Sequence, residues 1–171
     1  MRSFVIIILC VFLSSCASEK ASTPAYLNYG SKPKHIQICY KAADSMSSQL
    51  VAKRIQPLRV LKIAFVDIDN VESTSSSGRI YPEVIASRMS QLGYSMIELK
   101  VRSNSIKIVP QKGEMLLTYD QNLLASEYNA SAALIGYYKR DTYRRQNMVY
   151  ARIINLSDNS ILASEDFSIE D

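Results

Sequence analysis

The stretch Val60–Leu99, VLKIAFVDIDNVESTSSSGRIYPEVIASRMSQLGYSMIEL, decides the fold because it predicts a strand, a polar loop, an amphipathic helix and a second strand. Its opening part, Val60–Ile68, is almost entirely apolar, as in a strand that is buried on both faces. Small hydroxyl residues at 73–77 form the loop, and Gly78 lets the backbone turn into the next element. This strand, helix, strand unit predicts parallel strands joined by a right-handed crossover.

The helix in this stretch is predicted from apolar residues at helical spacing over Ile80–Leu92. Pro82 is expected in the first turn, where its missing amide costs little, and Glu83 beside it favours the positive helix end. Gly93 is expected to end the helix. The second strand then follows over Tyr94–Leu99.

The rest of the chain predicts another helix and more strands. A 3, 4, 3, 4 spacing of apolar residues between Ile36 and Leu50 predicts an amphipathic helix over His35–Arg54, and cover for the sheet is favoured over partner binding. A hairpin at 106–109 and 114–118 and a short helix over Asp120–Tyr128 are expected next. A three-stranded meander is expected at Ala132–Tyr138, Asn147–Asn155 and Ile161–Ile169, with a tight turn at Ser157–Ser160.

Length and composition limit the folds and the partners that are possible for this chain. The 171 residues, 47% apolar and 21% charged, allow one domain with a sizeable core. We expect an α/β fold of mixed α+β character, with two layers: a mixed sheet of about five to seven strands backed by two to three helices. The net charge of +4 is too mild to require nucleic acid. Because His35 is the single histidine, metal sites and histidine-based catalysis are not favoured.

The amino terminus predicts export and lipidation. Arg2 precedes the apolar run Phe4–Leu13, which is too short to span a bilayer and fits a secretory signal. Leu13-Ser14-Ser15-Cys16 matches a bacterial lipobox, in which the cysteine is acylated, although an ordinary signal peptide ending at a chance cysteine is the alternative. The residue after this cysteine is Ala17 rather than aspartate, and the resemblance to Gram-negative lipoproteins implies export to the outer membrane. We expect a signal peptide at 1–15, acylated Cys16 with a flexible tether at 16–34, and one globular domain at 35–171.

The three cysteines have different expected fates. Cys10 leaves with the signal peptide and Cys16 is consumed by lipid, so Cys39 has no partner in an oxidising compartment. We expect Cys39 to be buried rather than reactive. Acyl chains on Cys16 would contribute ~0.8 kcal/mol per buried CH₂ to membrane anchoring.

Two polar clusters are read as structural. The hydroxyl residues at 73–77 lack the Gly-Lys-Ser/Thr ending of a phosphate loop, and a serine nucleophile would need His35, which lies beside the tether. Backbone capping is therefore favoured there over nucleotide binding or hydrolysis. The acidic cluster at 67–72 does not match the spacing of a calcium loop. We expect it to cap a strand end in solvent, or to face a basic neighbour in a ring.

The hairpin over Lys139–Gln146 is the candidate interface. Tyrosine and arginine are enriched at protein interfaces. Lipid headgroups, cell-wall polymer or an acidic protein face are the candidate partners, and a solvated tip that blunts the strand ends is the alternative. The candidate interface residues are Lys139, Arg140, Tyr143, Arg144 and Arg145, near Tyr137, Tyr138 and Tyr150.

Short segments between residues 50 and 169 follow the order of one known family. They are Phe65-Val66-Asp67 before 74–79, Gly93-Tyr94 before Ile97-Glu98, Gly113-Glu114 with Leu117-Thr118 and Asp120, 134–138, 149–154 and Ile161-Leu162-Ala163. With the lipobox, this order resembles the FlgO family of flagellar outer-membrane lipoproteins. The chain departs from the family pattern at Ser77, before the Gly-Arg pair, and at Pro82.

The resemblance implies both a function and a fold. It implies a lipid-anchored, periplasm-facing subunit or stabiliser of an accessory ring of the flagellar basal body at the outer membrane, with other ring proteins and further copies of itself as partners. It also implies a fold similar to the amino-terminal domain of TolB, and neither an enzymatic activity nor a cofactor. The alternative is an envelope lipoprotein that binds a cell-wall or secretion-apparatus partner without a flagellar role.

Overall fold

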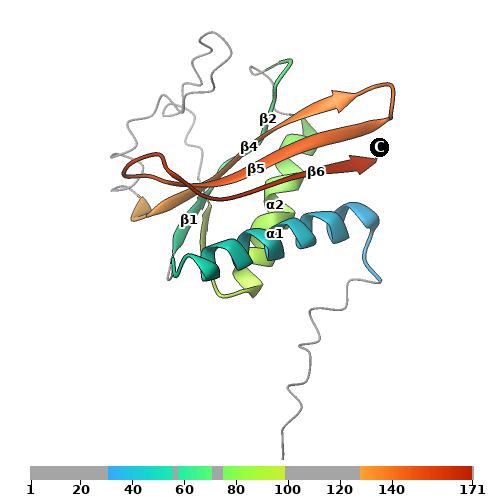
Figure 1. The fold of residues 1–171 in the computed structure, drawn as a ribbon. Coiled ribbons are helices and arrows are strands. Elements are labelled where there is room, and N and C mark those ends of the chain that lie inside the picture. Colours follow the sequence, from blue (N-terminus) through green and yellow to red (C-terminus); the bar gives the residue numbers. More distant parts are fainter. Residues whose placement is uncertain (1–30, 56–57, 71–74, 99–127, 171) are drawn as a thin grey trace, which may run out of the picture.

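Residues 31–55, 58–70, 75–98 and 128–170 are described in the computed structural model, where they form one mixed sheet backed by two helices (Figure 1). The expected fold class is confirmed by this arrangement. The elements in chain order are α1 (Lys34–Ala52), β1 (Arg59–Lys62), β2 (Val66–Asp67), α2 (Ser76–Gln91), β3 (Ser95–Glu98), β4 (Ala132–Asp141), β5 (Gln146–Asn155) and β6 (Ile161–Glu170).

The sheet has the strand order β3-β1-β4-β5-β6, and β2 pairs with β4. Strand β1 is parallel to both β3 and β4, so the parallel unit predicted around α2 is confirmed. Strands β4, β5 and β6 are antiparallel neighbours, which confirms the carboxyl-terminal meander. The predicted hairpin at 106–118 and most of the short helix before Tyr128 lie outside the described residues.

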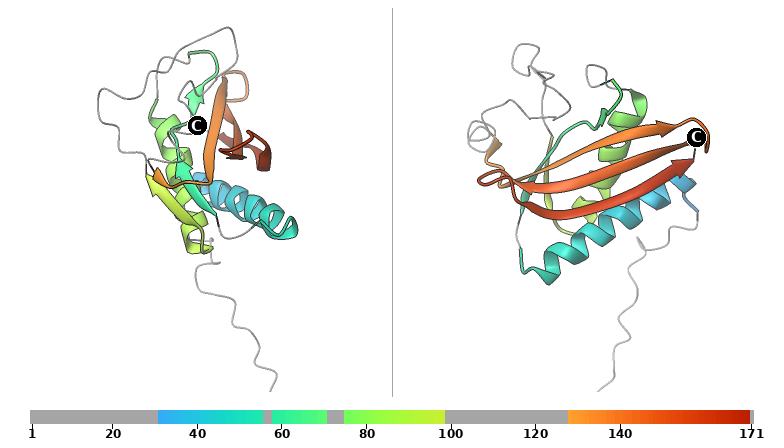
Figure 2. Two further views of the ribbon diagram at one scale, coloured as in Figure 1. Left: turned by 90° about the vertical axis from the view of Figure 1, so that its left-hand side faces the viewer. Right: turned by 45° about the horizontal axis from the view of Figure 1, so that its top comes forward.

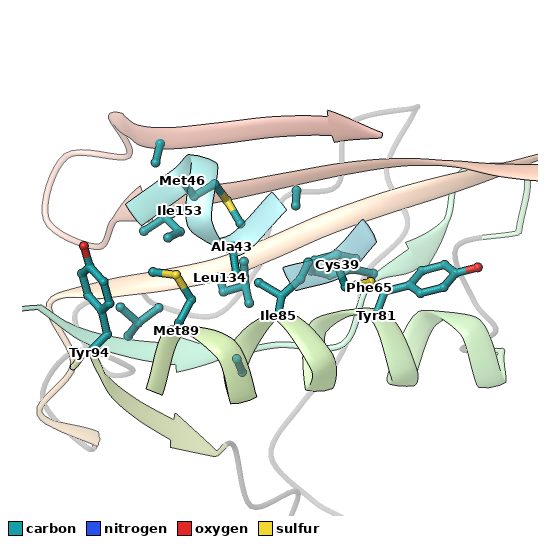
Figure 3. Close-up of a cluster of buried hydrophobic side chains, with 14 of the residues drawn as sticks. Cys39, Ala43, Met46, Phe65, Tyr81, Ile85, Met89, Tyr94, Leu134 and Ile153 are labelled. Carbon is teal, nitrogen blue, oxygen red and sulfur yellow. The ribbon is translucent and has the colours of Figure 1, made fainter. Parts of the chain in front are cut away.

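Both helices pack on the same face of the sheet (Figure 2). Helix α1 confirms the spacing argument, because Cys39, Ala43, Met46 and Leu50 are all fully buried. Figure 3 shows how residues of α1, α2 and the strands meet in this core. A smaller cluster, which includes Leu61, Ala133 and Ile154, lies on the opposite face.

The apolar run Val60–Ile68 is not one strand, contrary to the prediction. Lys62 pairs with Leu134 and Val66 pairs with Tyr137, so three residues of the run face two residues of β4. The extra residue interrupts the ladder, as in a β-bulge. The amide of Phe65 turns away from β4 and donates to the carbonyl of Gly78 at 2.8 Å.

Helix α2 begins at Ser76, four residues earlier than predicted, because Ser75 caps it. The hydroxyl of Ser75 accepts a hydrogen bond from the amide of Gly78 at 3.3 Å. Pro82 consequently lies inside the helix rather than in its first turn, and Glu83 is too far along to favour the positive end. Gly78 belongs to the helix as well, so it does not make the predicted turn.

Gly78 is required for a different reason, which is close packing. A Cβ atom at this position would lie 2.3 Å from the carbonyl oxygen of Phe65. The first turn of α2 therefore rests directly on the backbone at the break between β1 and β2. At the other end of the helix, Gly93 has a φ of 94°, which confirms its predicted role as the terminator.

Candidate functional site

The predicted interface hairpin is the tip of the β4–β5 arm. Paired residues run in register from Ala132 and Asn155 to Asp141 and Gln146, so the connection is residues 142–145. The Asp141 carboxylate accepts a hydrogen bond from the Arg144 amide at 3.0 Å and lies 3.4 Å from its guanidinium. Arg145 takes a φ of 52°, which closes the turn.

The structure brings all five candidate interface residues to this tip, on both sides of the arm. Tyr143 is 94% exposed, and the Arg144 side chain is 69% exposed. Lys139 and Arg140 are consecutive in a strand, so their side chains point to opposite faces. Lys139 lies 3.5 Å from the carboxylate of Asp69, and both groups are largely exposed, so this pair adds little stability. The tip thus presents basic side chains in more than one direction.

Two of the neighbouring tyrosines form a platform on the face opposite the helices. Tyr137 and Tyr150 are a cross-strand pair whose rings stack with centroids 4.8 Å apart. The guanidinium of Arg152 lies 5.8 Å from the centre of the Tyr137 ring. This platform continues from the basic tip along the same arm, and its side chains are half-buried.

Tyr138 does not belong to this surface, although the sequence grouped it with the others. It is 3% exposed and faces the helices, where its ring meets Tyr81 edge-on. Its hydroxyl donates to the hydroxyl of Ser75, the residue that caps α2. The alternation of side chains along β4 separates it from Tyr137. Tyr138 therefore stabilises the domain rather than contacting a partner.

The hydroxyl residues before α2 have the structural role that was favoured, as far as they are described. Ser75 is used in capping, and Ser76 and Ser77 form the first turn of the helix. His35 lies closer to them than expected, because it and Ser77 line one shallow depression of about 240 Å³. Among the described residues no hydrogen bond joins these two side chains, so His35 is not placed as a base for Ser77 in this structure.

The acidic cluster also fits capping at a strand end. The carboxylate of Asp67 accepts a hydrogen bond from the amide of Asp69 at 3.0 Å, which stabilises the turn after β2. Glu72 lies outside the described residues. Among the described residues, no group of three or more histidine, cysteine, aspartate or glutamate side chains is arranged to hold a metal ion.

Lys62 forms an ionic cluster that the sequence did not predict. It pairs with Glu83 of α2 and, at 3.4 Å, with Glu98 of β3, beside a shallow depression of about 410 Å³. Burial lowers the pKa of Lys62, but the two carboxylates outweigh it and raise the pKa above its usual value. The cluster depends on the parallel register that sets Lys62 opposite Glu98, which spacing along the chain does not reveal.

The predicted lipidation site, Cys16, lies outside the described residues. No helix among the described residues is long and apolar enough to cross a membrane. Cys39 is fully buried, as expected, and burial raises the pKa of its thiol to about 12. Its thiolate is therefore scarce at neutral pH, which makes the residue a poor nucleophile.

The FlgO protein family model matches residues 40–171, which include every described strand. The chain belongs to the FlgO family. Membership of the FlgO family supports a lipoprotein of the bacterial envelope. No curated protein sequence matches this FlgO-family chain.

Two solved structures share the fold of this FlgO-family domain. The LpoB C-terminal domain from Escherichia coli is 15% identical, with a TM-score of 0.51, over 78% of this chain and 98% of that one. The LpoB C-terminal domain from Salmonella enterica is 12% identical, with a TM-score of 0.50, over the same shares of the two chains. At these identities the likeness concerns the fold.

Proposed function

We propose that the protein is a non-enzymatic outer-membrane lipoprotein that builds or stabilises an accessory ring of the flagellar basal body and so supports motility. The observation that carries this proposal is the FlgO family match over residues 40–171, which follows a lipobox ending at Cys16. The acylated cysteine holds the chain in the outer membrane, and the domain faces the periplasm. Its partners are other flagellar ring proteins and further copies of the chain.

The basic tip of the β4–β5 arm is the surface we assign to ring contacts. Arg144 and Tyr143 are exposed at the end of a hairpin of two ten-residue strands, where they can reach a neighbouring subunit. Residues 139–146 carry four basic side chains, Lys139, Arg140, Arg144 and Arg145, and one carboxylate, Asp141, while Asp69 lies beside Lys139. An acidic face on the adjacent ring subunit is the matching partner.

Imaging of basal bodies in a deletion strain tests the function itself. We expect the accessory ring to be lost or reduced and swimming to be impaired, with recovery when the gene is restored. An intact ring with normal swimming would contradict the proposal. If purified peptidoglycan captured the protein while the deletion left swimming intact, an envelope role without the flagellum would replace it.

The anchor is tested by Cys16→Ala, with Cys10→Ala as the matched control. We expect Cys16→Ala to remain unprocessed and to leave the outer-membrane fraction, while Cys10→Ala, in the apolar part of the signal, is processed normally. Correct processing and membrane association of Cys16→Ala would exclude lipidation at this residue.

The interface is tested by reversing charges at the tip with Arg144→Glu and Arg145→Asp. Aspartate is chosen at 145 because it tolerates the positive φ better than glutamate does. The control, Lys41→Glu with Arg79→Glu, makes the same charge change at exposed positions of α1 and α2. We expect ring assembly and swimming to fail only in the tip variant, with both proteins unfolding at the same temperature. Equal swimming of the two variants would exclude the tip as an interface.

A further inference from the structure

Strand β6 is the last strand of the sheet, so it pairs with a neighbouring strand on one side only. Along its first half, side chains of α1 take the place of the missing strand. The Gln49 amide donates to the Ser164 carbonyl at 2.8 Å, and its oxygen accepts from the Ser164 amide at 3.1 Å. Lys53 donates to the carbonyl of Leu162 at 2.7 Å. This half of the edge is therefore closed.

The second half of β6 is open. In an antiparallel pair the backbone groups of alternate residues point away from the neighbouring strand, and Ser164 is one of these. By the same alternation, the backbone groups of Asp166 and Ser168 point away from β5. Among the described residues, neither has a hydrogen-bond partner on that side, and both residues are exposed. An unpaired stretch of this kind is a template for another strand.

The side chains along the open half select the strand that fits. Asp166 and Glu170 are both exposed, and strand alternation places them two positions on either side of the small Ser168, on the same side of the strand. Glu170 already attracts one cation, Lys34, at 2.6 Å. A strand added beside β6 would place its alternate side chains next to these carboxylates, which favours lysine and arginine.

A second copy of the same edge is a poor occupant. Antiparallel pairing of two β6 strands centred on Ser168 would set Asp166 of each copy opposite Glu170 of the other. Like charges directly opposite each other destabilise a strand pair. The open edge therefore fits a strand of different sequence.

We propose that the Asp166–Glu170 half of β6 binds an extended segment of another protein, which adds a strand to the sheet and carries lysine or arginine at alternate positions. Backbone hydrogen bonds to Asp166 and Ser168 supply the affinity, and the two carboxylates supply the selectivity. This site requires no flagellar role, and it is distinct from the arginine-rich tip of the β4–β5 arm.

The probe is a labelled, end-blocked heptapeptide of alternating lysine and valine, added to the full-length protein in detergent. Fluorescence anisotropy measures its affinity for Ser168→Pro and for the matched control Ser168→Ala. The amide of Ser168 points away from β5, so proline there removes a hydrogen bond to the peptide without breaking the β5–β6 ladder. We expect Ser168→Pro to weaken binding about tenfold, while Ser168→Ala leaves it unchanged. Thermal unfolding checks that both variants are folded.

Charge and location are tested in the same way. Asp166→Lys should weaken binding, and a heptapeptide with glutamate in place of lysine should not bind. Bound peptide should slow hydrogen exchange at the amides of Asp166 and Ser168. Equal binding to the proline and alanine variants, or equal binding of a backbone-methylated peptide, would overturn the proposal. A protein dimer that is lost in Ser168→Pro would assign the edge to a second copy and overturn it too.

Discussion

The amide of Phe65 donates its hydrogen bond to the carbonyl of Gly78, 2.8 Å away. In an uninterrupted helix this carbonyl accepts from the residue four positions later, but that residue is Pro82, which has no amide hydrogen. The proline thus leaves an acceptor without a donor in its own helix, and the break between β1 and β2 leaves a donor outside the sheet. The hydrogen bond between Phe65 and Gly78 satisfies both of these groups.

Gly78→Ala should destabilise the domain by about 1–3 kcal/mol, because its Cβ would sit 2.3 Å from the Phe65 carbonyl oxygen. This is opposite in sign to the gain of about 1 kcal/mol that the same change usually brings to a helix. The control is Ser87→Ala, at an exposed position of the same helix, which should be neutral or slightly stabilising. Urea unfolding measures both, and equal stability of the two variants would contradict the packing argument.

Asp44→Ala should cost about 3–5 kcal/mol, because it removes the carboxylate 2.7 Å from the Nε of fully buried Arg88. Arg88→Met should cost less, since the Asp44 side chain is 31% exposed and water can solvate it. The double variant should therefore be more stable than Asp44→Ala alone, as a cycle of denaturation measurements can establish. Additive losses would mean that the pair is not coupled.

Removal of the hydroxyl of Tyr138 and removal of the hydroxyl of Ser75 should not be additive. Ser75→Ala loses the α2 cap and should cost about 1 kcal/mol, while Tyr138→Phe loses the hydrogen bond to that cap at a similar cost. The combined variant should lose less than the sum, since both act on one network. Ser76→Ala, at an exposed position of the first turn, is the control and should leave the unfolding midpoint unchanged.

Stability should decrease between pH 9 and about pH 12 with a contribution from Cys39. Burial raises the pKa of its thiol from 9.0 to about 12, so in this range the folded chain keeps a proton that the unfolded chain has lost. Each pH unit then lowers the free energy of unfolding by up to about 1.4 kcal/mol. Well below pH 9 the thiol is protonated in both states and has no effect on the pH dependence.

The variant Cys39→Ala isolates the contribution of the thiol from that of every other ionisable group. Its overall stability will be lower, so the comparison is between slopes of unfolding free energy against pH. We expect a shallower decline for the variant above pH 9. Identical slopes would mean that the thiol ionises in the folded protein.

Regular spacing in the sequence predicted the helix and the strands that can be recognised from their own pattern of apolar residues. Helix α1 follows from the spacing of Cys39, Ala43, Met46 and Leu50, each of which is buried. The three strands of the meander follow from their apolar runs, and Asn159, with a φ of 61°, fits the predicted turn between the last two. These signals are local, so no knowledge of a distant partner was needed.

Features that depend on a partner from another element were missed. The break after β1 requires the Gly78 carbonyl, and the early start of α2 requires a serine that also bonds to Tyr138. Arg88 gave one hint, since it falls within the apolar stripe between Ile85 and Met89, where a solvated charge is out of place. Its carboxylate partner lies 44 positions away, which a helical period does not identify.

For the candidate site, the sequence predicted which residues gather at the hairpin but not which face of the sheet each side chain lies on. Side chains alternate between the two faces of the sheet along β4, but the sequence does not say which set faces the helices. The buried ring of Tyr138 shows that its set does. The open half of the β6 edge could not be predicted from the sequence either. Its extent depends on which residues of β6 are hydrogen-bonded to Gln49 and Lys53 of α1.

The pairing of the first helix with the last strand also governs the time course of folding. Lys34 and Glu170 are bonded across 136 residues, and Ser45 and Glu165 across 120. Contacts of such separation require large loops to close, so they slow the search for the native state. The apolar stripe of α1 is consequently buried fully only when β6, the last strand, has joined the sheet. Truncation within β6 should therefore leave a chain that cannot complete its core.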